Sequence, residues 1–271
     1  LFIKMSCFSK IFNCSPTEQL GIFDEFDIII VAGQSNAVGY QCDEYTPSNS
    51  YVVRRSSTCL GKNVSENVII PMKVSDDNPQ LKPGNHNIGT VCALSLYEHN
   101  PNSRPICVLN VAVAGSSIEE WNPDNKKSYF GKMIKELDMI TKGRKDVRIL
   151  TLLWVQGETN AMKGKDEGYE TKLERCMDAF KKLLPYKTPI AVGEMSKTAK
   201  IKRLGNGELM CPNYDVIADI INEVVGAYPD TYLVKTEGLT TFDNLHYYPS
   251  EVFIYGKRFA TVVRPHLVYD T

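Results

Sequence analysis

The sequence has no apolar run long enough to cross a membrane. A membrane-spanning helix needs about 20 consecutive apolar residues, and no stretch of this chain approaches that length. The first residues also lack the continuous apolar region of about 7–15 residues that a signal peptide requires. We therefore expect no membrane insertion, interpret residues 1–25 as an N-terminal extension, and favour a cytoplasmic, intracellular protein.

An excess of charge of one sign is also absent. The 271 residues include 31 Lys and Arg and 32 Asp and Glu, which gives a net charge of −1. Proteins that bind nucleic acid or an anionic membrane surface concentrate basic residues on one face. The short basic clusters here are interrupted by acidic neighbours, so no nucleic-acid partner is expected.

The chain lacks a cysteine motif, although it contains eight cysteines. They are scattered, with no C-x-x-C pair and no histidine at the spacing of a metal site. Cys92 and Cys107 lie in apolar runs and are predicted to be buried thiols of the core. No metal site is predicted.

What the sequence does contain is an alternation of short apolar runs and amphipathic stretches of helical period. Because parallel strands are buried on both faces, they appear as continuous apolar runs. The pattern predicts βαβ units with right-handed crossovers, and therefore a three-layer α/β/α sandwich with a parallel five-stranded sheet. The predicted strands are residues 27–32, 106–112, 148–155, 189–192 and 232–235. The predicted helices are residues 89–99, 129–141, 169–184, 215–228 and 250–263.

Residues 41–88 break this alternation. They are rich in Ser, Asn, Asp, Pro and Tyr and show no convincing period. Two interpretations are open: an excursion beside the strand ends where ligands bind in such sheets, or an irregular surface insertion. In either case a single domain, residues 26–268, contains this insertion.

The first apolar run ends in Gly33, Gln34, Ser35 and Asn36, a serine flanked by two amides. Ser and Asn are preferred helix caps, so Ser35 or Asn36 could simply cap the next helix. The alternative is that Ser35 is a presented nucleophile. The local sequence does not separate these alternatives.

The ends of the other runs favour the second alternative. They carry Gly115, Gln156 with Glu158, and Asp243 with His246. In a parallel sheet all carboxyl ends lie along one edge, so we expect these residues to converge on Ser35.

These residue types suit acyl transfer. A serine hydroxyl needs a base within hydrogen-bond reach, and His246 titrates near working pH. Asp243, three residues earlier, is placed to orient the imidazole if the segment forms a turn. The backbone N–H groups of Ser35 and Gly115 and the side-chain amide of Gln156 are the expected oxyanion donors.

Four sequence blocks together resemble the SGNH/GDSL hydrolase superfamily: GQSN (33–36), AGSSIEEW (114–121), WVQGE (154–158) and DNLH (243–246). The greatest similarity is to the branch of sialate O-acetylesterases and acetylxylan esterases, carbohydrate esterase family six. The resemblance implies a flavodoxin-like three-layer sandwich and the removal of acetyl groups from a sugar, either sialic acid or an acetylated polysaccharide, without metal or cofactor. It also implies that Ser35 is the nucleophile, His246 the base and Asp243 its partner. The oxyanion hole would then be Ser35, Gly115 and Gln156.

The remaining polar residues of these blocks are assigned supporting roles. Gln34, Asn36 and Glu158 are predicted to brace the site, although Glu158 competes with Asp243 as the partner of His246. Trp121 and His86 are candidate substrate contacts, with a place in the core as the alternative for the Trp121 ring. The family block W-H-Q-G-E-x-D has Val155 and Asn160 here in place of His and Asp.

Two other functions remain open. An esterase or thioesterase for another acyl group would use the same triad but need an apolar trough. A catalytically silent carbohydrate-binding protein would keep the fold without needing an activated serine.

Overall fold

The computed structural model describes residues 25–39, 56–60, 69–73, 87–100, 104, 106–143, 146–164 and 167–267. The predicted N-terminal extension and His86 therefore lie outside the described residues, as does most of the segment 41–88. Within the described part of the chain, no helix is long and apolar enough to span a bilayer.

A seven-stranded sheet forms the middle of the molecule, with the order β3-β2-β4-β1-β5-β6-β7. Five of these strands are mutually parallel, in the order β4-β1-β5-β6-β7, which confirms the predicted parallel sheet. Their bounds are β1 (Glu25–Gly33), β4 (Ile106–Asn110), β5 (Asp146–Val155), β6 (Ile190–Gly193) and β7 (Thr231–Val234). The first strand in the sequence lies centrally, so its carboxyl end has neighbours on both sides.

Two further strands extend the sheet beyond the prediction. β2 (Ser56–Leu60) pairs antiparallel with β4, and β3 (Ile69–Lys73) pairs antiparallel with β2. Both lie in the segment 41–88, for which the sequence predicted no regular element. β2 covers the edge of β4 that the five parallel strands alone would leave unpaired.

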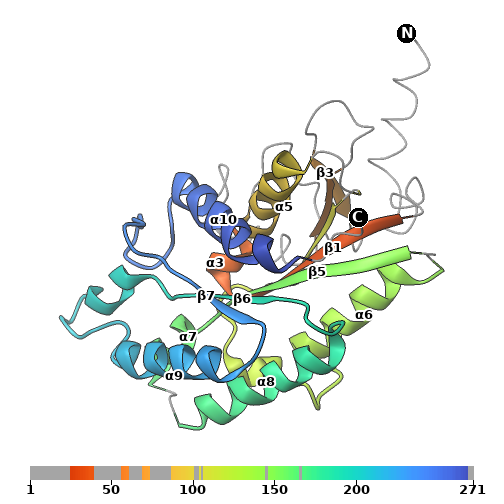
Figure 1. Ribbon diagram of the computed structural model, residues 1–271. Helices are drawn as coiled ribbons and strands as arrows, with labels where there is room; N and C mark the ends of the chain where they lie inside the picture. Colours follow the sequence, from red (N-terminus) through yellow and green to blue (C-terminus); the bar gives the residue numbers. More distant parts are fainter. Residues whose placement is uncertain are drawn as a thin grey trace.

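Helices cover both faces of the sheet. Figure 1 shows α5 and α10 on one face and α6, α8 and α9 on the other. The helices are α3 (Ser35–Val38), α5 (Ile88–His99), α6 (Tyr129–Thr141), α7 (Glu158–Lys163), α8 (Tyr169–Leu183), α9 (Tyr214–Ala227) and α10 (Pro249–Val263), with the 3-10 helices η3 (Ile118–Trp121), η4 (Lys197–Ile201) and η5 (Arg264–His266). The three-layer α/β/α prediction is confirmed.

The alternation of side chains along β1 divides the core in two. Ile28 and Ile30 pack in the cluster that includes α6, α8 and α9, whereas Ile29 and Val31 pack in the cluster that includes α5 and α10. Successive side chains of a strand point to opposite faces, so a strand buried on both faces must be apolar throughout. Cys92 and Cys107 are buried thiols in these clusters, as predicted.

A buried ion pair marks the end of β1 that lies away from Ser35. Asp27 is fully buried, and Arg148 of β5 donates to both of its carboxylate oxygens over 2.9 Å. A paired and hydrogen-bonded charge is tolerated in a core, whereas an unpaired one is costly. Polar groups thus occur at both ends of β1.

Candidate active site

Ser35 is delivered by a sharp turn at the end of β1. Gly33 has a φ of +117°, and a Cβ there would collide with the carbonyl oxygen of Val155 on the neighbouring strand. The backbone N–H of Gln34 donates to that same oxygen over 2.8 Å. Gln34 occupies the cap position of α3, and Ser35 is the first residue of the helix. Ser35 is therefore not the N-cap residue, and the capping alternative is wrong.

Ser35, His246 and Asp243 meet although more than 200 residues separate the first from the others. The Oγ of Ser35 lies 3.0 Å from Nε2 of His246. The opposite ring nitrogen, Nδ1, lies 2.8 Å from Oδ2 of Asp243. Because a carboxylate only accepts, Nδ1 carries the hydrogen of this bond and Nε2 is left to accept from the serine. The carboxylate that pairs with His246 is thus that of Asp243, not Glu158.

The loop from 241 to 247 is built to hold this pair. Oδ1 of Asp243 accepts from the backbone N–H groups of Leu245 and His246 over 2.9 and 2.7 Å. Asn244 adopts a left-handed φ of 64°, which asparagine tolerates better than most residues. One carboxylate oxygen therefore orders the turn and the other orients the imidazole, as the spacing of three residues predicted.

Burial sets the ionisation of the pair. It lowers the pKa of His246 below the ordinary 6.5, and this outweighs the hydrogen bond and charge of Asp243, which favour the protonated ring. Partial burial by itself raises the pKa of Asp243, but hydrogen bonds from the backbone and ring of His246 hold that pKa below its ordinary value. A neutral imidazole beside an ionised carboxylate is the state needed to accept a proton from serine.

Gln156 lies at the end of β5, fully buried, with its amide oriented by fixed neighbours. Its Oε1 accepts from the hydroxyl of Tyr169 over 2.9 Å. Its Nε2 donates to Oδ1 of Asn160 over 2.8 Å, and Asn160 Oδ1 is identified as an acceptor because it also accepts from the backbone N–H of Ile118 over 3.0 Å. The other contacts of Nε2 are long: 3.3 Å to the carbonyl of Ser116 and 3.4 Å to Oε1 of Gln34. One of its two hydrogens is therefore held firmly and the other only weakly.

Gln34, Asn36 and Glu158 tie the strand ends together. Oε1 of Gln34 accepts from the backbone N–H groups of Gly157 and Thr159, over 3.3 and 3.2 Å. Nδ2 of Asn36 donates to Oε1 of Glu158 over 2.9 Å and to the carbonyl of Leu245 over 3.1 Å. Burial raises the pKa of Glu158, against the hydrogen bonds it accepts from its own backbone N–H and from Asn36. These three side chains connect β1, α7 and the His246 loop.

The loop after β4 places Gly115 beside the same turn. The backbone N–H of Val113 and the Oγ of Ser116 both donate to the carbonyl of Gly33, over 2.9 and 3.2 Å. Gly115 lies between Val113 and Ser116 in the sequence, and it is exposed and has a φ of +72°. Its backbone is thus held close to the end of β1.

Trp121 is in the core and not in the site. Its ring is completely buried, meets Trp154 edge-on with centroids 5.1 Å apart, and donates from Nε1 to the Oγ of Ser116 over 3.0 Å. The predicted contact between Trp121 and substrate is wrong, because no face of the ring is exposed to a sugar. The ring instead supports the loop that carries Gly115.

Three side chains with a direct bearing on the site were not predicted. Asn160 and Tyr169 orient Gln156, and Lys202 places Nζ 3.5 Å from Oδ2 of Asp243. The substitution at Asn160 relative to the family block was a visible signal. Tyr169 begins a predicted helix and Lys202 lies in an irregular stretch, and neither position carries a sequence signal of this role.

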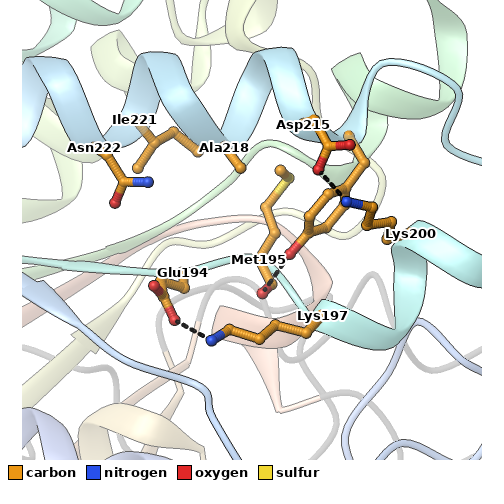
Figure 2. Close-up of a pocket in the computed structure, with 9 residues that line it drawn as sticks. Glu194, Met195, Lys197, Lys200, Asp215, Ala218, Ile221 and Asn222 are labelled. Atoms are coloured by element: carbon orange, nitrogen blue, oxygen red, sulfur yellow. Dashed lines mark hydrogen bonds and ion pairs between the residues drawn. The ribbon is translucent and has the colours of Figure 1, made fainter.

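A separate cavity of about 270 Å³ lies between α9 and the segment that follows β6. Figure 2 shows Lys197 paired with Glu194, and Lys200 paired with Asp215. Its described lining includes none of Ser35, Asp243 and His246. Across the described ranges, no group of three or more His, Cys, Asp or Glu is arranged to hold a metal ion.

Comparison with known proteins identifies the family of this chain. Residues 25–264 match the family model described as carbohydrate esterase, sialic acid-specific acetylesterase. The chain belongs to this family. No curated protein has a sequence significantly similar to it.

Several solved structures have the same fold. A protein of Arabidopsis thaliana has a TM-score of 0.61 at 18% identity, over 89% of this chain and 99% of its own. NanS has a TM-score of 0.61 at 14% identity, over 88% of this chain and 96% of its own. A carbohydrate acetylesterase of Xanthomonas citri has a TM-score of 0.57 at 15% identity, over 90% of this chain and 56% of its own. At these identities the likeness concerns the fold.

Proposed function

We propose that this member of the carbohydrate esterase family is a serine esterase that removes O-acetyl groups from a carbohydrate. The observation that carries the proposal is the continuous contact from Ser35 Oγ to His246 Nε2 and from His246 Nδ1 to Asp243 Oδ2, at 3.0 and 2.8 Å. A helix cap or a binding protein needs no serine hydroxyl aligned with an oriented imidazole.

The reaction proceeds in two acyl transfers. Ser35 Oγ attacks the acetyl carbonyl carbon while Nε2 of His246 takes the hydroxyl proton. The bond between the acetyl carbon and the sugar oxygen then breaks, and His246 returns the proton to that oxygen, which leaves as a hydroxyl. Water next attacks acetyl-Ser35 with His246 again as base, and acetate leaves as Ser35 recovers its proton. Asp243 stabilises the imidazolium formed in each half of the reaction.

Three donors are assigned to the oxyanion that forms in each transfer. They are the backbone N–H groups of Ser35 and Gly115 and the weakly held Nε2 hydrogen of Gln156. Such donors act in a water-poor site where they need no reorganisation. The buried surroundings of Gln156 support this assignment, as does the bond of Nε2 to Asn160, which orients the amide while its other hydrogen is held only weakly.

The substrate class is tested by measuring acetate release from O-acetylated sialic acid, acetylated xylo-oligosaccharide and 4-nitrophenyl acetate. We expect acetate from at least one of the two sugars, and faster hydrolysis of 4-nitrophenyl acetate than of 4-nitrophenyl octanoate. A preference for octanoate would favour an esterase for another acyl group. Binding of a sugar without any acetate release would favour a silent carbohydrate-binding protein.

The pH dependence of kcat/KM should show one acidic limb. Because burial lowers the pKa of His246, the neutral base persists to lower pH than for an exposed histidine. We expect kcat/KM for 4-nitrophenyl acetate to rise with pH through a midpoint below about 6.5 and then to level off. A profile that is flat between about pH 4.5 and 8 contradicts a histidine base.

A further inference from the structure

Three lysines lie in the six-residue span 197–202 after β6, and their side chains have different partners. Lys197 and Lys200 belong to η4 and pair with Glu194 and Asp215 at the cavity of Figure 2. Lys202 follows the helix and contacts Asp243 instead, with Nζ 3.5 Å from Oδ2. Lys202 thus places a positive charge beside the proposed triad, whereas Lys197 and Lys200 line a separate cavity.

The oxygen that Lys202 contacts is the one that holds His246. Oδ2 of Asp243 lies 2.8 Å from Nδ1 of the imidazole as well as 3.5 Å from Nζ of Lys202. The two side chains are only 20% and 32% exposed, for Lys202 and Asp243 respectively. Charges that are partly removed from water are screened less than exposed ones, so the electrostatic attraction between Lys202 and Asp243 is substantial at this distance.

The backbone holds Lys202 in place. Its carbonyl accepts from the N–H of Met210 over 2.7 Å, and its own N–H donates to the carbonyl of Ala199 over 3.3 Å. The next residue, Arg203, forms a bridge with Leu209. η4 is also linked to the loop that carries Asp243 and His246, because the hydroxyls of Thr198 and Thr241 are hydrogen-bonded at 2.7 Å. The position of Lys202 relative to Asp243 is thus fixed from two sides.

We propose that Lys202 is a positioning residue that shares the carboxylate of Asp243 with His246 and thereby keeps the imidazole neutral and ready to accept a proton; this rests on the function proposed above. During acyl transfer the negative charge of Asp243 stabilises the imidazolium of His246. The positive charge of Lys202 on the same carboxylate limits that stabilisation. The pair is thereby tuned so that His246 both accepts the proton of Ser35 and gives it up to the leaving sugar oxygen.

Among the described residues, three carboxylates on the elements around this pair have other partners. Glu158 of α7 accepts from Asn36, and Glu251 at the start of α10 accepts from Thr240. Glu194 pairs with Lys235 over 2.9 Å. In agreement with the geometry, burial lowers the pKa of His246, Asp243 raises it, and Lys202 lowers it further.

Replacing Lys202 by methionine removes the charge and keeps most of the side chain, and Lys202→Gln provides a second neutral variant. We expect the pKa of His246 to rise by about 0.3 to 0.7 pH units in both, which corresponds to a partly exposed ion pair. The measurement is an NMR titration of the imidazole in protein labelled with 13C-histidine, with the His246 signal assigned by its loss in His246→Asn. Lys202→Arg retains the charge and is expected to titrate like the wild type. Lys200→Gln, whose partner is Asp215, is the matched control and should leave His246 unchanged.

The NMR readout does not depend on turnover, so the two proposals fail separately. If His246 titrates at the wild-type pH or lower in folded Lys202→Met and Lys202→Gln, the role of Lys202 is wrong. If Ser35→Ala keeps wild-type activity, the proposed function is wrong, whatever the titration shows. When both proposals hold, the acidic limb of kcat/KM moves to higher pH in the neutral variants by the same amount as the NMR titration.

Discussion

Replacing Ser35 by alanine is expected to lower kcat/KM for 4-nitrophenyl acetate at least about a thousandfold, because the reaction then has no nucleophile. The residual rate comes from the oxyanion donors and from binding alone. Little change in folding is expected, since the substitution removes one hydroxyl whose contact is the 3.0 Å bond to His246. The measurements are steady-state hydrolysis and urea denaturation of both proteins.

Ser128→Ala is the matched control for this substitution. Ser128 caps α6 by accepting from the backbone N–H of Gly131 over 3.1 Å. Removing it should lower the free energy of unfolding by about 1 kcal/mol without changing kcat/KM of the folded protein. If Ser35→Ala and Ser128→Ala were equally active, Ser35 would not be the nucleophile.

Replacing Gln156 by alanine is expected to have the second largest effect. Removal of a single side-chain donor from an oxyanion hole costs about 100- to 1000-fold in kcat. The loss should appear in kcat with little change in KM, because the donor acts mainly on the charge that develops in the transition state. Circular dichroism and thermal denaturation check that the variant remains folded, since the substitution also removes the partner of Tyr169 and Asn160.

Tyr169→Phe tests how much the orientation of the Gln156 amide contributes, as distinct from the donor itself. It removes the bond to Oε1 of Gln156 and leaves Nε2 in the site. We expect kcat to fall about tenfold or less, because the oxyanion donor is then present but less well oriented.

The role of Gln156 itself is contradicted if folded Gln156→Ala keeps kcat within about threefold of the wild type, because the backbone donors would then suffice.

The convergence of the site was predictable because it depends on topology. Apolar runs buried on both faces predicted parallel strands, and the carboxyl ends of parallel strands share one edge. Ser35 and His246 were placed together on that basis, although they are far apart in the sequence. The spacing from Asp243 to His246 also predicted a shared turn, and the hydrogen bonds of Asp243 explain why that turn forms.

Features that depend on contacts between segments distant in the sequence, whether of backbone or of side chains, were not predictable. β2 and β3 lie in the polar segment 41–88, where β2 pairs with β4 and β3 pairs with β2, and no periodicity in the sequence indicates either strand. The sequence leaves Trp121 with two possible places, the core and a sugar contact, and its packing against Trp154 decides for the core. Lys202 reaches Asp243 through the backbone geometry of an irregular segment.

Covalent labelling with a fluorophosphonate shows whether Ser35 is an activated nucleophile, because this reagent reacts with serines activated by a base and forms a stable adduct. We expect one label per protein, located by mass spectrometry on the peptide that contains Ser35, with esterase activity lost in parallel. The label should be absent in Ser35→Ala and should form far more slowly in His246→Ala. An active protein that takes no label at Ser35, or takes it at another serine, would contradict the account.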